Sequence, residues 1–586
     1  MSSLFDFIVV GGELRTNAET DQTALTVYTG GTAGCLVASR LANAKTRPSV
    51  LLLETGGDTN KQEYQRTYDK FNTLFTQPHL DHGQASTVAR LVKLAGKVLV
   101  ARVRRTSRCG RWVYDYNERL LLCLRHLLTI IITIDQAKDE FDHWAAIVGD
   151  SRWSFDAFEN LHVEDLPNGG TEYARPDPRY HGYDGEIDLA IGPVLESEVK
   201  HAPLNPDVNS GNPIGFGVSP HSSWRGMRTT SASAFLRPDR VPPNLTVLVD
   251  SRITRLHFDG DRVSEVETES GIRFSCSKDV ILAGGAIDTP RLLLLSGVGP
   301  ANELEKLNIT VARDVPGVGG SLTDHPTAFM TFEMREGFSD RHTFSGNAEA
   351  MEAAVKQFAT DGTGPLTVHY GTCPVAFGKI DEVSESSTFA SLADPIQKLL
   401  LQPTVPHYEF AMCGPLLPPG LLASDAEGSF TFFVALQNSQ ARGSIKLLSS
   451  DPKEPPLIDP GYLTNEHDTF VLTKATQTAL KFMETPTMQK YRKRDVWAPT
   501  SSSYDDVKAF LKANVAGLWH PSCSMPMGHR DDRRSAVDAD LVVHGFKNLR
   551  VADLSVTPFL PSGHPQIIAY IIGAVAVAAM IEKYEL

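Results

Sequence analysis

Two segments near the N-terminus decide the fold: Phe5-Asp-Phe-Ile-Val-Val-Gly-Gly12 and Gly31-Thr-Ala-Gly-Cys-Leu-Val-Ala-Ser-Arg-Leu41. The first is an apolar run typical of a buried parallel strand, and the second has the apolar spacing of a helix. If residues 13–30 are left out, Gly11 and Gly12 join Gly31-Thr32-Ala33-Gly34 in a complete GxGxxG turn. In such a turn, glycines allow a tight bend, approach of a pyrophosphate and close packing of helix on strand. The helix N-terminus then faces the diphosphate.

A second strand and an acidic residue follow at the spacing that a nucleotide site requires. Ser49-Val-Leu-Leu-Leu-Glu54 is strand-like, and Glu54 lies 20 residues after Gly34, where a ribose-binding acid is expected. The sequence therefore predicts a dinucleotide site. Its members are Gly11, Gly12, Gly31, Thr32, Ala33, Gly34 and Glu54.

Residues 13–30 interrupt this motif with 18 mostly polar residues that have no apolar period. One interpretation is an insertion within a nucleotide site. A second is an ordinary surface loop whose flanking glycines only mark turns. A third is a retained short intron, because the ends of the segment can be encoded by splice-site sequences. A cDNA that lacks these codons would favour the third interpretation.

Composition restricts the function classes. The chain has 586 residues, 56 Lys+Arg against 70 Asp+Glu (net charge −14), and 41% apolar residues. These values argue against a disordered chain and against an electrostatic nucleic-acid binder, and they predict two or more lobes. The seven cysteines are widely spaced without a CxxC pair, so neither a disulfide framework nor a metal site is predicted. The N-terminus lacks a signal-peptide pattern, so a cytoplasmic location is expected. We expect the apolar run 567–581 to be a buried helix rather than a membrane span.

A second strand–turn–helix unit carries a resemblance to a known family. It reads Asp279-Val-Ile-Leu-Ala-Gly-Gly-Ala-Ile-Asp-Thr-Pro-Arg-Leu-Leu-Leu-Leu-Ser-Gly-Val-Gly-Pro300. From Gly285 to Gly299 it resembles, position by position, the second signature of the glucose–methanol–choline (GMC) flavin oxidoreductases. Asp314-Val-Pro-Gly-Val-Gly-Gly-Ser-Leu-Thr-Asp-His-Pro326 resembles the next block of that family.

Three C-terminal motifs extend the resemblance. Trp519-His520-Pro521 resembles the catalytic-histidine motif of the family, and Leu549-Arg-Val-Ala-Asp-Leu-Ser-Val-Thr-Pro558 resembles its closing flavin-binding strand. Ser562-Gly-His-Pro-Gln566 resembles its second active-site motif. The resemblance covers residues 5–12, 31–99 and 137–586 and is strongest to fungal members.

The resemblance implies FAD as cofactor and an alcohol as substrate. It implies that His520 is the base for the hydroxyl proton, a task that imidazole suits because its ordinary pKa is about 6.5. His564 would bind the substrate oxygen. The remaining cofactor contacts that it implies are Trp519, Pro565 and Gln566 at the flavin ring, Asp553 at the diphosphate and ribityl chain, and the backbone of Ile253 at the adenine.

One segment departs from the family. Family members carry a second glycine-rich stretch after the strand-like Gly96-Lys-Val-Leu99, but here Ala101-Arg-Val-Arg-Arg-Thr-Ser-Arg-Cys-Gly-Arg-Trp-Val-Tyr-Asp115 follows. It could be a basic anion site or a solvated charged loop. We favour a reading-frame error across about 100–136, because a one-base shift restores glycines there if Arg108, Arg111 and Trp112 are encoded by G-rich codons. The printed chain would then bind FAD poorly, whereas the corrected product would bind it.

The predicted fold class is α/β: a Rossmann-like FAD domain with a parallel sheet, and an α+β substrate domain with an antiparallel sheet. The FAD domain is expected at 1–160, 225–330 and 521–586, and the substrate domain at 161–224 and 331–520. Strand-like runs at 428–436 and 443–448 are expected in the sheet over the flavin. The predicted function is oxidation of a small organic alcohol, in secondary metabolism, with oxygen or another electron acceptor. The alternatives are a redox-neutral lyase or cyclase of the same fold, a flavin-deficient relic, and a nicotinamide dehydrogenase, which the paired histidines oppose.

Overall fold

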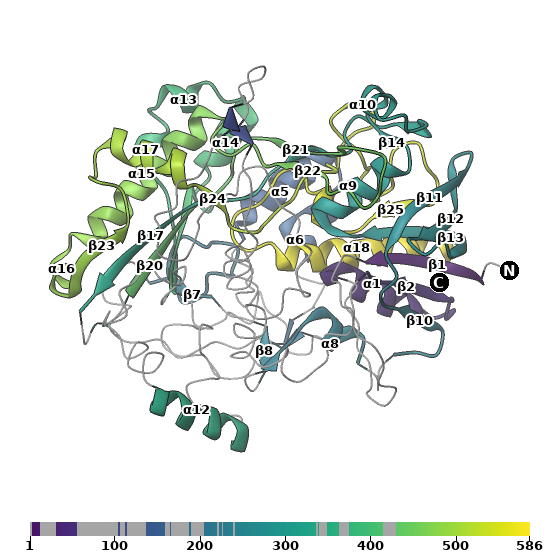
Figure 1. The fold of residues 1–586 in the computed structure, drawn as a ribbon, viewed down its shortest axis with the longest axis horizontal. Coiled ribbons are helices and arrows are strands. Elements are labelled where there is room, and N and C mark those ends of the chain that lie inside the picture. The colour runs from purple at the N-terminus through teal and green to yellow at the C-terminus, as the bar shows by residue number, and fades with distance from the viewer. Residues whose placement is uncertain are drawn as a thin grey trace.

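Two large sheets form the framework of the molecule and lie side by side in Figure 1. This computed structural model describes residues 3–11, 31–55, 136–158, 204–219, 222–224, 227–237, 241–335, 338, 348–361, 374–413 and 429–586, with short strand segments at 104–105, 112–113, 164–165 and 187–188. One sheet is mainly parallel and the other is antiparallel, as the predicted fold class requires.

The parallel sheet contains the two strands predicted from the N-terminal segments. Its strand order is β10-β2-β1-β13-β12-β11, and β25 also pairs with β13. Val10 aligns with Leu53, and Gly11 aligns with Ala283, so the carboxyl ends of three parallel strands meet at one edge. Ligands of open α/β sheets bind at this kind of edge. The strands are β1 (Ser3–Gly11), β2 (Val50–Leu53), β10 (Leu245–Leu248), β11 (Ile253–Asp259), β12 (Arg262–Thr268), β13 (Arg273–Ala283) and β25 (Leu549–Val551).

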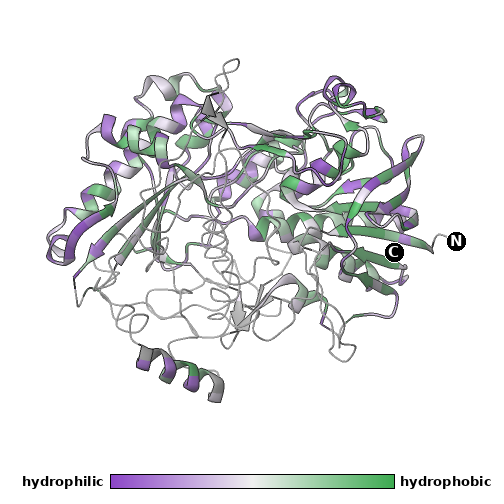
Figure 2. Ribbon diagram, in the orientation of Figure 1, coloured by the Kyte–Doolittle hydropathy of each residue, from purple (hydrophilic) through white to green (hydrophobic). Residues whose placement is uncertain are grey.

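Two apolar helices cover this sheet. Helix α1 (Gly31–Ala42) packs on β1, β2 and β13, and α18 (Gln566–Tyr584) packs on α1. Figure 2 shows the strongly hydrophobic character of α18 and of the strands beside it. By length and composition α18 could cross a membrane, but 72% of its apolar window is buried inside the protein. It is therefore a core helix here, as the sequence predicts.

The antiparallel sheet has the order β23-β17-β20-β19-β18-β7, with β24 also paired to β17. Helix α15 (Glu466–Met483) packs on its strands, and α17 (Tyr504–Asn514) packs on α15. Phe332, Phe432 and Val434 are among the fully buried side chains of its core. The strands are β7 (Gly215–Val218), β17 (Pro326–Met334), β18 (Pro374–Gly378), β19 (Tyr408–Cys413), β20 (Ser429–Leu436), β23 (Arg492–Trp497) and β24 (Ala516–Gly517).

One strand prediction needs a correction. The run 428–436 forms β20 in the antiparallel sheet, but the run 443–448 forms β21 (Gly443–Lys446) in a separate three-stranded sheet with β16 (Gly320–Leu322) and β22 (Leu457–Asp459). Gly443 has Asp459 backbone atoms where a Cβ would stand, so this strand is held against β22 instead. The domain boundaries stay a prediction, and residues 13–30 and most of 100–136 lie outside the described residues.

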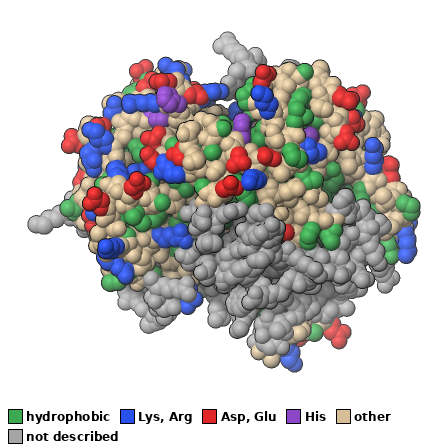
Figure 3. Space-filling model, turned by 180° about the vertical axis from the view of Figure 1, so that it is seen from behind, with side chains coloured by type: hydrophobic (Ala, Val, Ile, Leu, Met, Phe, Trp, Pro, Cys, Tyr) green, Lys and Arg blue, Asp and Glu red, His purple; other side chains and the backbone are tan. Residues whose placement is uncertain are grey.

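Figure 3 shows the molecule from behind. On this face, the basic and acidic side chains of the described residues lie next to one another.

Candidate active site

The glycine turn brings α1 very close to the parallel sheet. Gly31 begins the helix with a left-handed φ of +64°, which favours glycine, and Gly11 ends β1. A Cβ on Gly34 would lie 3.2 Å from the Ala283 Cβ, so only glycine leaves the observed spacing undisturbed. This is the packing role that the motif predicts. Gly12 lies outside the described residues.

Neighbouring elements hold the first turn of α1. The Ser231 hydroxyl donates to the Thr32 carbonyl oxygen at 2.6 Å. Ala33 is buried, and a Cβ on Gly573 of α18 would lie 3.3 Å from its carbonyl oxygen. Glu54 follows β2 and is fully buried, and its backbone bonds to Leu248 and Ser251. The predicted nucleotide residues that the structure describes therefore gather at one edge of the sheet.

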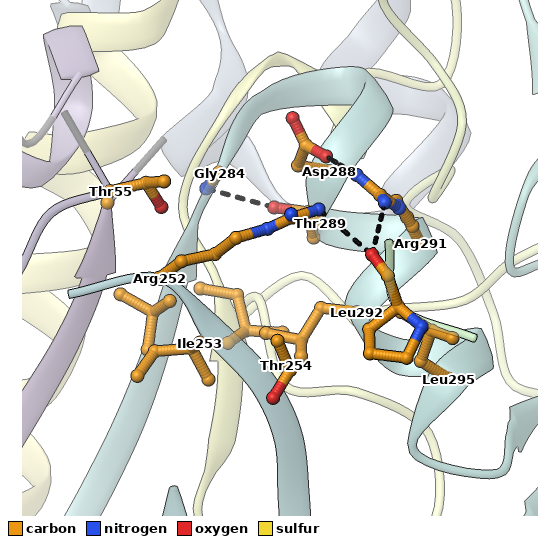
Figure 4. A pocket seen from close by; sticks show the side chains of 14 residues that line it. Thr55, Arg252, Ile253, Thr254, Gly284, Asp288, Thr289, Arg291, Leu292 and Leu295 are labelled. Carbon is orange, nitrogen blue, oxygen red and sulfur yellow. Dashed lines mark hydrogen bonds and ion pairs between the residues drawn. The ribbon is translucent and has the colours of Figure 1, made fainter. Parts of the chain in front are cut away.

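A pocket opens at this edge and is shown in Figure 4. Apolar side chains of Ile253, Leu292 and Leu295 form part of its wall. The guanidinium groups of Arg252 and Arg291 both donate to the Pro452 carbonyl oxygen, at 3.2 and 2.7 Å. This combination of apolar side chains, backbone at strand ends and cationic groups suits an adenosine diphosphate moiety. The sequence predicted Ile253 here but missed both arginines, which lie in or beside segments that it did single out.

Asp553 has a more structural role than its motif predicts. Its carboxylate accepts hydrogen bonds from the Gly285 amide at 2.9 Å, the Thr289 hydroxyl at 2.6 Å and the Ser555 amide at 2.8 Å. Burial raises the pKa of this carboxyl. Because both oxygens bind protein donors, the side chain fixes the start of α9 (Gly285–Leu295) beside the pocket. A direct contact with the cofactor stays a prediction.

The pairing of β17 with β24 brings two histidines together. Pro326 aligns with Gly517, so the residue before β17 lies near the residues after β24. His325 Nδ1 and His520 Nδ1 are 3.0 Å apart, and both rings are buried. The Asp324 carboxylate accepts from the backbone amides of His325 and His520, at 2.7 and 2.9 Å. This carboxylate and the strand pairing together fix the position of the His520 ring.

His564 approaches the same point from the loop before α18. The His520 and His564 ring centroids are 5.3 Å apart and the rings are perpendicular, with interplanar angle 89°. The Glu409 carboxylate on β19 lies 3.4 Å from His564 Nε2. Two motifs 44 residues apart in sequence thus place their histidines face to edge.

Burial controls the protonation of two of these rings. The pKa of His520 lies well below the usual 6.5, because burial disfavours the cation and because His325 and His564 are close. Burial and His564 also lower the pKa of His325, to about 3. Burial raises the pKa of the Asp324 carboxyl to about 6. Both His325 and His520 are therefore neutral near pH 7.

The other predicted ring contacts surround the histidines. Trp519 adopts a left-handed φ of +61°, and its ring lies 6.0 Å from that of Phe329. Pro565 is the N-cap of α18, and the partly exposed Gln566 is its first residue.

Sequence reasoning missed three residues of this site. His325 and Asp324 belong to segment 314–326, which resembles a block of the family but carries no predicted role for its individual residues. Glu409 carries a different signal, because it is an acid within the otherwise apolar strand-like run Tyr408-Glu-Phe-Ala-Met-Cys413. An ionisable side chain in a buried strand often marks a functional site.

Comparisons with known proteins identify the same family that the sequence motifs resemble. Two family models, both described as GMC oxidoreductase, match residues 136–327 and 439–573, together more than half of the chain. The glucose dehydrogenase (FAD, quinone) of Drosophila melanogaster is 28% identical over 593 residues, which cover 96% of this chain and 84% of that protein. A GMC family oxidoreductase of Annulohypoxylon moriforme, mfmG, is 28% identical over 475 residues, covering 74% and 76% of the two chains.

Solved structures share the fold. A variant of the formate oxidase of Aspergillus oryzae RIB40 superposes with a TM-score of 0.79 at 22% identity, covering 100% of this chain and 99% of that one. A fungal aryl-alcohol oxidase superposes with a TM-score of 0.73 at 20% identity, covering 99% of each chain. The family, the fold class, the oxidoreductase class and FAD as cofactor are confirmed predictions. The chain belongs to the GMC oxidoreductase family and is an FAD-dependent oxidoreductase.

Proposed function

We propose that this protein oxidises a small apolar or aromatic alcohol, with His520 as the base and His564 as the group that binds the substrate oxygen. The observation that carries the proposal is the perpendicular pair of buried imidazoles with centroids 5.3 Å apart. A substrate hydroxyl beside this pair would lie within reach of both rings. The assignment to secondary metabolism stays a prediction without a structural argument.

The described residues fit FAD. Gly31 and Gly34 keep the turn open toward the strand ends, and the pocket of Figure 4 offers apolar walls with Arg252 and Arg291 at its side. Glu54 would bind the ribose, Ile253 the adenine, and Trp519, Pro565 and Gln566 the flavin end. FAD, when bound, takes up the hydride from the alcohol carbon.

The contact between His325 and His520 defines which nitrogen of His520 acts as base. Two neutral imidazoles joined through Nδ1 atoms share one proton, so one nitrogen donates and the other accepts. We assign the shared proton of this pair to His520 Nδ1, with His325 Nδ1 as its acceptor. This assignment leaves the His520 Nε2 lone pair to take the substrate proton.

His564 complements this neutral base. The Glu409 carboxylate at 3.4 Å favours the cationic form of the His564 ring. A cation beside the substrate oxygen stabilises the alkoxide-like charge that develops as the proton leaves. Neighbouring groups whose environments favour different protonation states divide the roles of base and charge stabiliser in this way.

The acid limb of the pH profile tests the neutral base. Because the pKa of His520 is well below 6.5, kcat/KM should stay level as the pH falls to 6.5 and decline only below it. The measurement is kcat/KM against pH with a non-ionising alcohol. A decline with a midpoint at or above pH 6.5 contradicts the assignment, because it would require a solvated histidine.

The aromatic surroundings predict the substrate class. Trp519 and Phe329 are partly exposed beside the histidines, and Phe329 contacts Phe433 at 4.7 Å between centroids. Aromatic rings prefer edge-to-face neighbours, so an aryl alcohol should give a higher kcat/KM than a short aliphatic alcohol. Phe329→Ala should remove most of this preference. Equal kcat/KM values for benzyl alcohol and ethanol would contradict it.

A further inference from the structure

Three consecutive residues that end in His564 are each held by a buried polar side chain. Ser562 donates to the Glu140 carboxyl oxygen Oε2 through its amide at 3.0 Å and its hydroxyl at 2.6 Å. The Gly563 amide donates to Gln437 Oε1 at 2.8 Å, and Gln437 also donates to Glu409 at 3.2 Å. Glu409 in turn faces the His564 ring. Glu140 and Gln437 are thus the two side chains that bind the backbone just before His564.

Glu140 is the unusual member of this set. It lies in the first turn of α5 (Lys138–Val148), which lies between the two sheets in the view of Figure 1, and it is completely buried. No ion pair joins it to a cation within the described residues. Its second oxygen, Oε1, accepts no hydrogen bond from them either. Lys379 interacts with Glu140 electrostatically but forms no ion pair with it. A buried carboxylate with one bare oxygen and no ion-pair partner is costly, whereas a protonated carboxyl group is not.

Hydrogen bonds from Ser562 and Asn438 lower the pKa of Glu140, and burial outweighs them. The side chain of Asn438 interacts with this carboxyl group, and the Asn438 amide oxygen lacks a donor within the described part of the chain. A carboxylic acid supplies a donor in this region, and a carboxylate supplies none. Burial raises the pKa of Glu140 to about 7.

We propose that Glu140 is a neutral carboxylic acid that positions His564 by holding Ser562. The proposal rests on the proposed role of His564. Glu140 acts through Ser562 and touches neither substrate nor flavin, so it is a positioning residue. Gly563 has a left-handed φ of +79°, so the loop has little freedom once Ser562 and Gly563 are both bound. Loss of the Ser562 contacts would let the imidazole move.

Ionisation of Glu140 would disturb this arrangement above about pH 7. The new charge would add to that of Glu409 and alter the field at His564. The titratable and charged groups around Glu140 are Asp139 and His143 on its own helix, Lys379 after β18, Glu409 on β19, and His564.

The test compares Glu140→Gln with Glu140→Val. The glutamine keeps an acceptor for Ser562 and has an amide donor in place of the O–H of the neutral acid. The kcat at about pH 6 should therefore stay within about 3-fold of wild type, and kcat should no longer change through the ionisation of residue 140. The valine removes the contact, so kcat should fall about 10- to 100-fold with a smaller change in KM. Glu466→Gln, an exposed acid in the first turn of α15, is the matched control.

Two readouts do not depend on activity. The infrared difference between wild type and Glu140→Gln should contain the carbonyl band of a protonated carboxylic acid that disappears as the pH rises through about 7. In protein with ¹⁵N-labelled histidine, Glu140→Val and Ser562→Ala should shift the His564 ring signals but not those of His257. Absence of the infrared band at about pH 6, or wild-type kcat and unshifted His564 signals in both variants, would overturn the proposal.

The two hypotheses fail in different ways. If wild-type protein oxidises no alcohol, the proposed function fails, while the infrared and histidine signals still decide the state and role of Glu140. If Glu140→Val does not fold, Ser562→Ala and the infrared band carry the test.

Discussion

Replacing His520 with alanine should lower kcat by about 10²- to 10⁴-fold while the protein keeps its flavin. In the proposed mechanism His520 Nε2 supplies the lone pair for the hydroxyl proton, and alanine has no group that can accept this proton; the variant also removes the ring that holds His325 Nδ1 at 3.0 Å. The side chain is buried in the active-site cluster and makes no contact with the pocket of Figure 4. Flavin absorbance per protein should therefore stay near the wild-type value.

The measurement is kcat with the best alcohol of a panel, alongside the flavin-to-protein absorbance ratio. His529→Ala is the control, because His529 is exposed, with 81% of its side chain accessible, and should leave kcat unchanged. A His520→Ala protein with more than about one tenth of the wild-type kcat would contradict the role of base.

Replacing Asp279 with alanine should have the largest effect on stability, about 3–5 kcal/mol. Asp279 is completely buried on β13, and its carboxylate binds Arg550 Nε at 2.8 Å, Lys583 Nζ at 3.1 Å and the Tyr584 hydroxyl at 2.5 Å. The change would leave the buried Arg550 guanidinium without its carboxylate partner. It would also release the C-terminal end of α18, whose other end carries the His564 loop.

Urea unfolding with matched m-values measures this effect. Asp261→Ala is the control, because Asp261 pairs with Lys547 at the surface, where both side chains are accessible to water. A loss below about 1 kcal/mol for Asp279→Ala would show that the cluster does not anchor α18.

The fold was largely predictable because its determinants are local. The strands from Phe5 to Val10 and from Val50 to Leu53 are continuous apolar runs, and Gly34 is needed at one point of contact with Ala283. Each of these features follows from sterics or periodicity within a few residues. The C-terminal helix was recognisable for the same reason.

The site was predictable only in part, because it depends on pairings between distant segments. His325 and His520 meet through the register of β17 with β24, and Glu140 reaches Ser562 from 422 residues away. Periodicity does not give a register between strands so far apart. Asp553 matched a flavin motif, yet its carboxylate is occupied by Gly285, Thr289 and Ser555.

The intron and reading-frame hypotheses concern two N-terminal segments, residues 13–30 and about 100–136. Residues 13–30 lie outside the described residues, and within 100–136 only β3 (Arg104–Arg105), β4 (Trp112–Val113) and Gln136 are described. The N-terminal family model begins to match at residue 136, close to where the resemblance resumes. The intron and reading-frame hypotheses therefore stay predictions, and the cDNA sequence decides both.

Anaerobic spectroscopy of the protein expressed from the full-length cDNA tests the central claim most directly. We expect the purified protein to be yellow and its flavin absorbance to bleach when an aryl alcohol is added without oxygen, with one equivalent of aldehyde or ketone formed per flavin. A flavin that stays oxidised with every alcohol would contradict alcohol oxidation. If product formed all the same, the chemistry would be redox-neutral, and a protein without flavin even after incubation with FAD would be the relic.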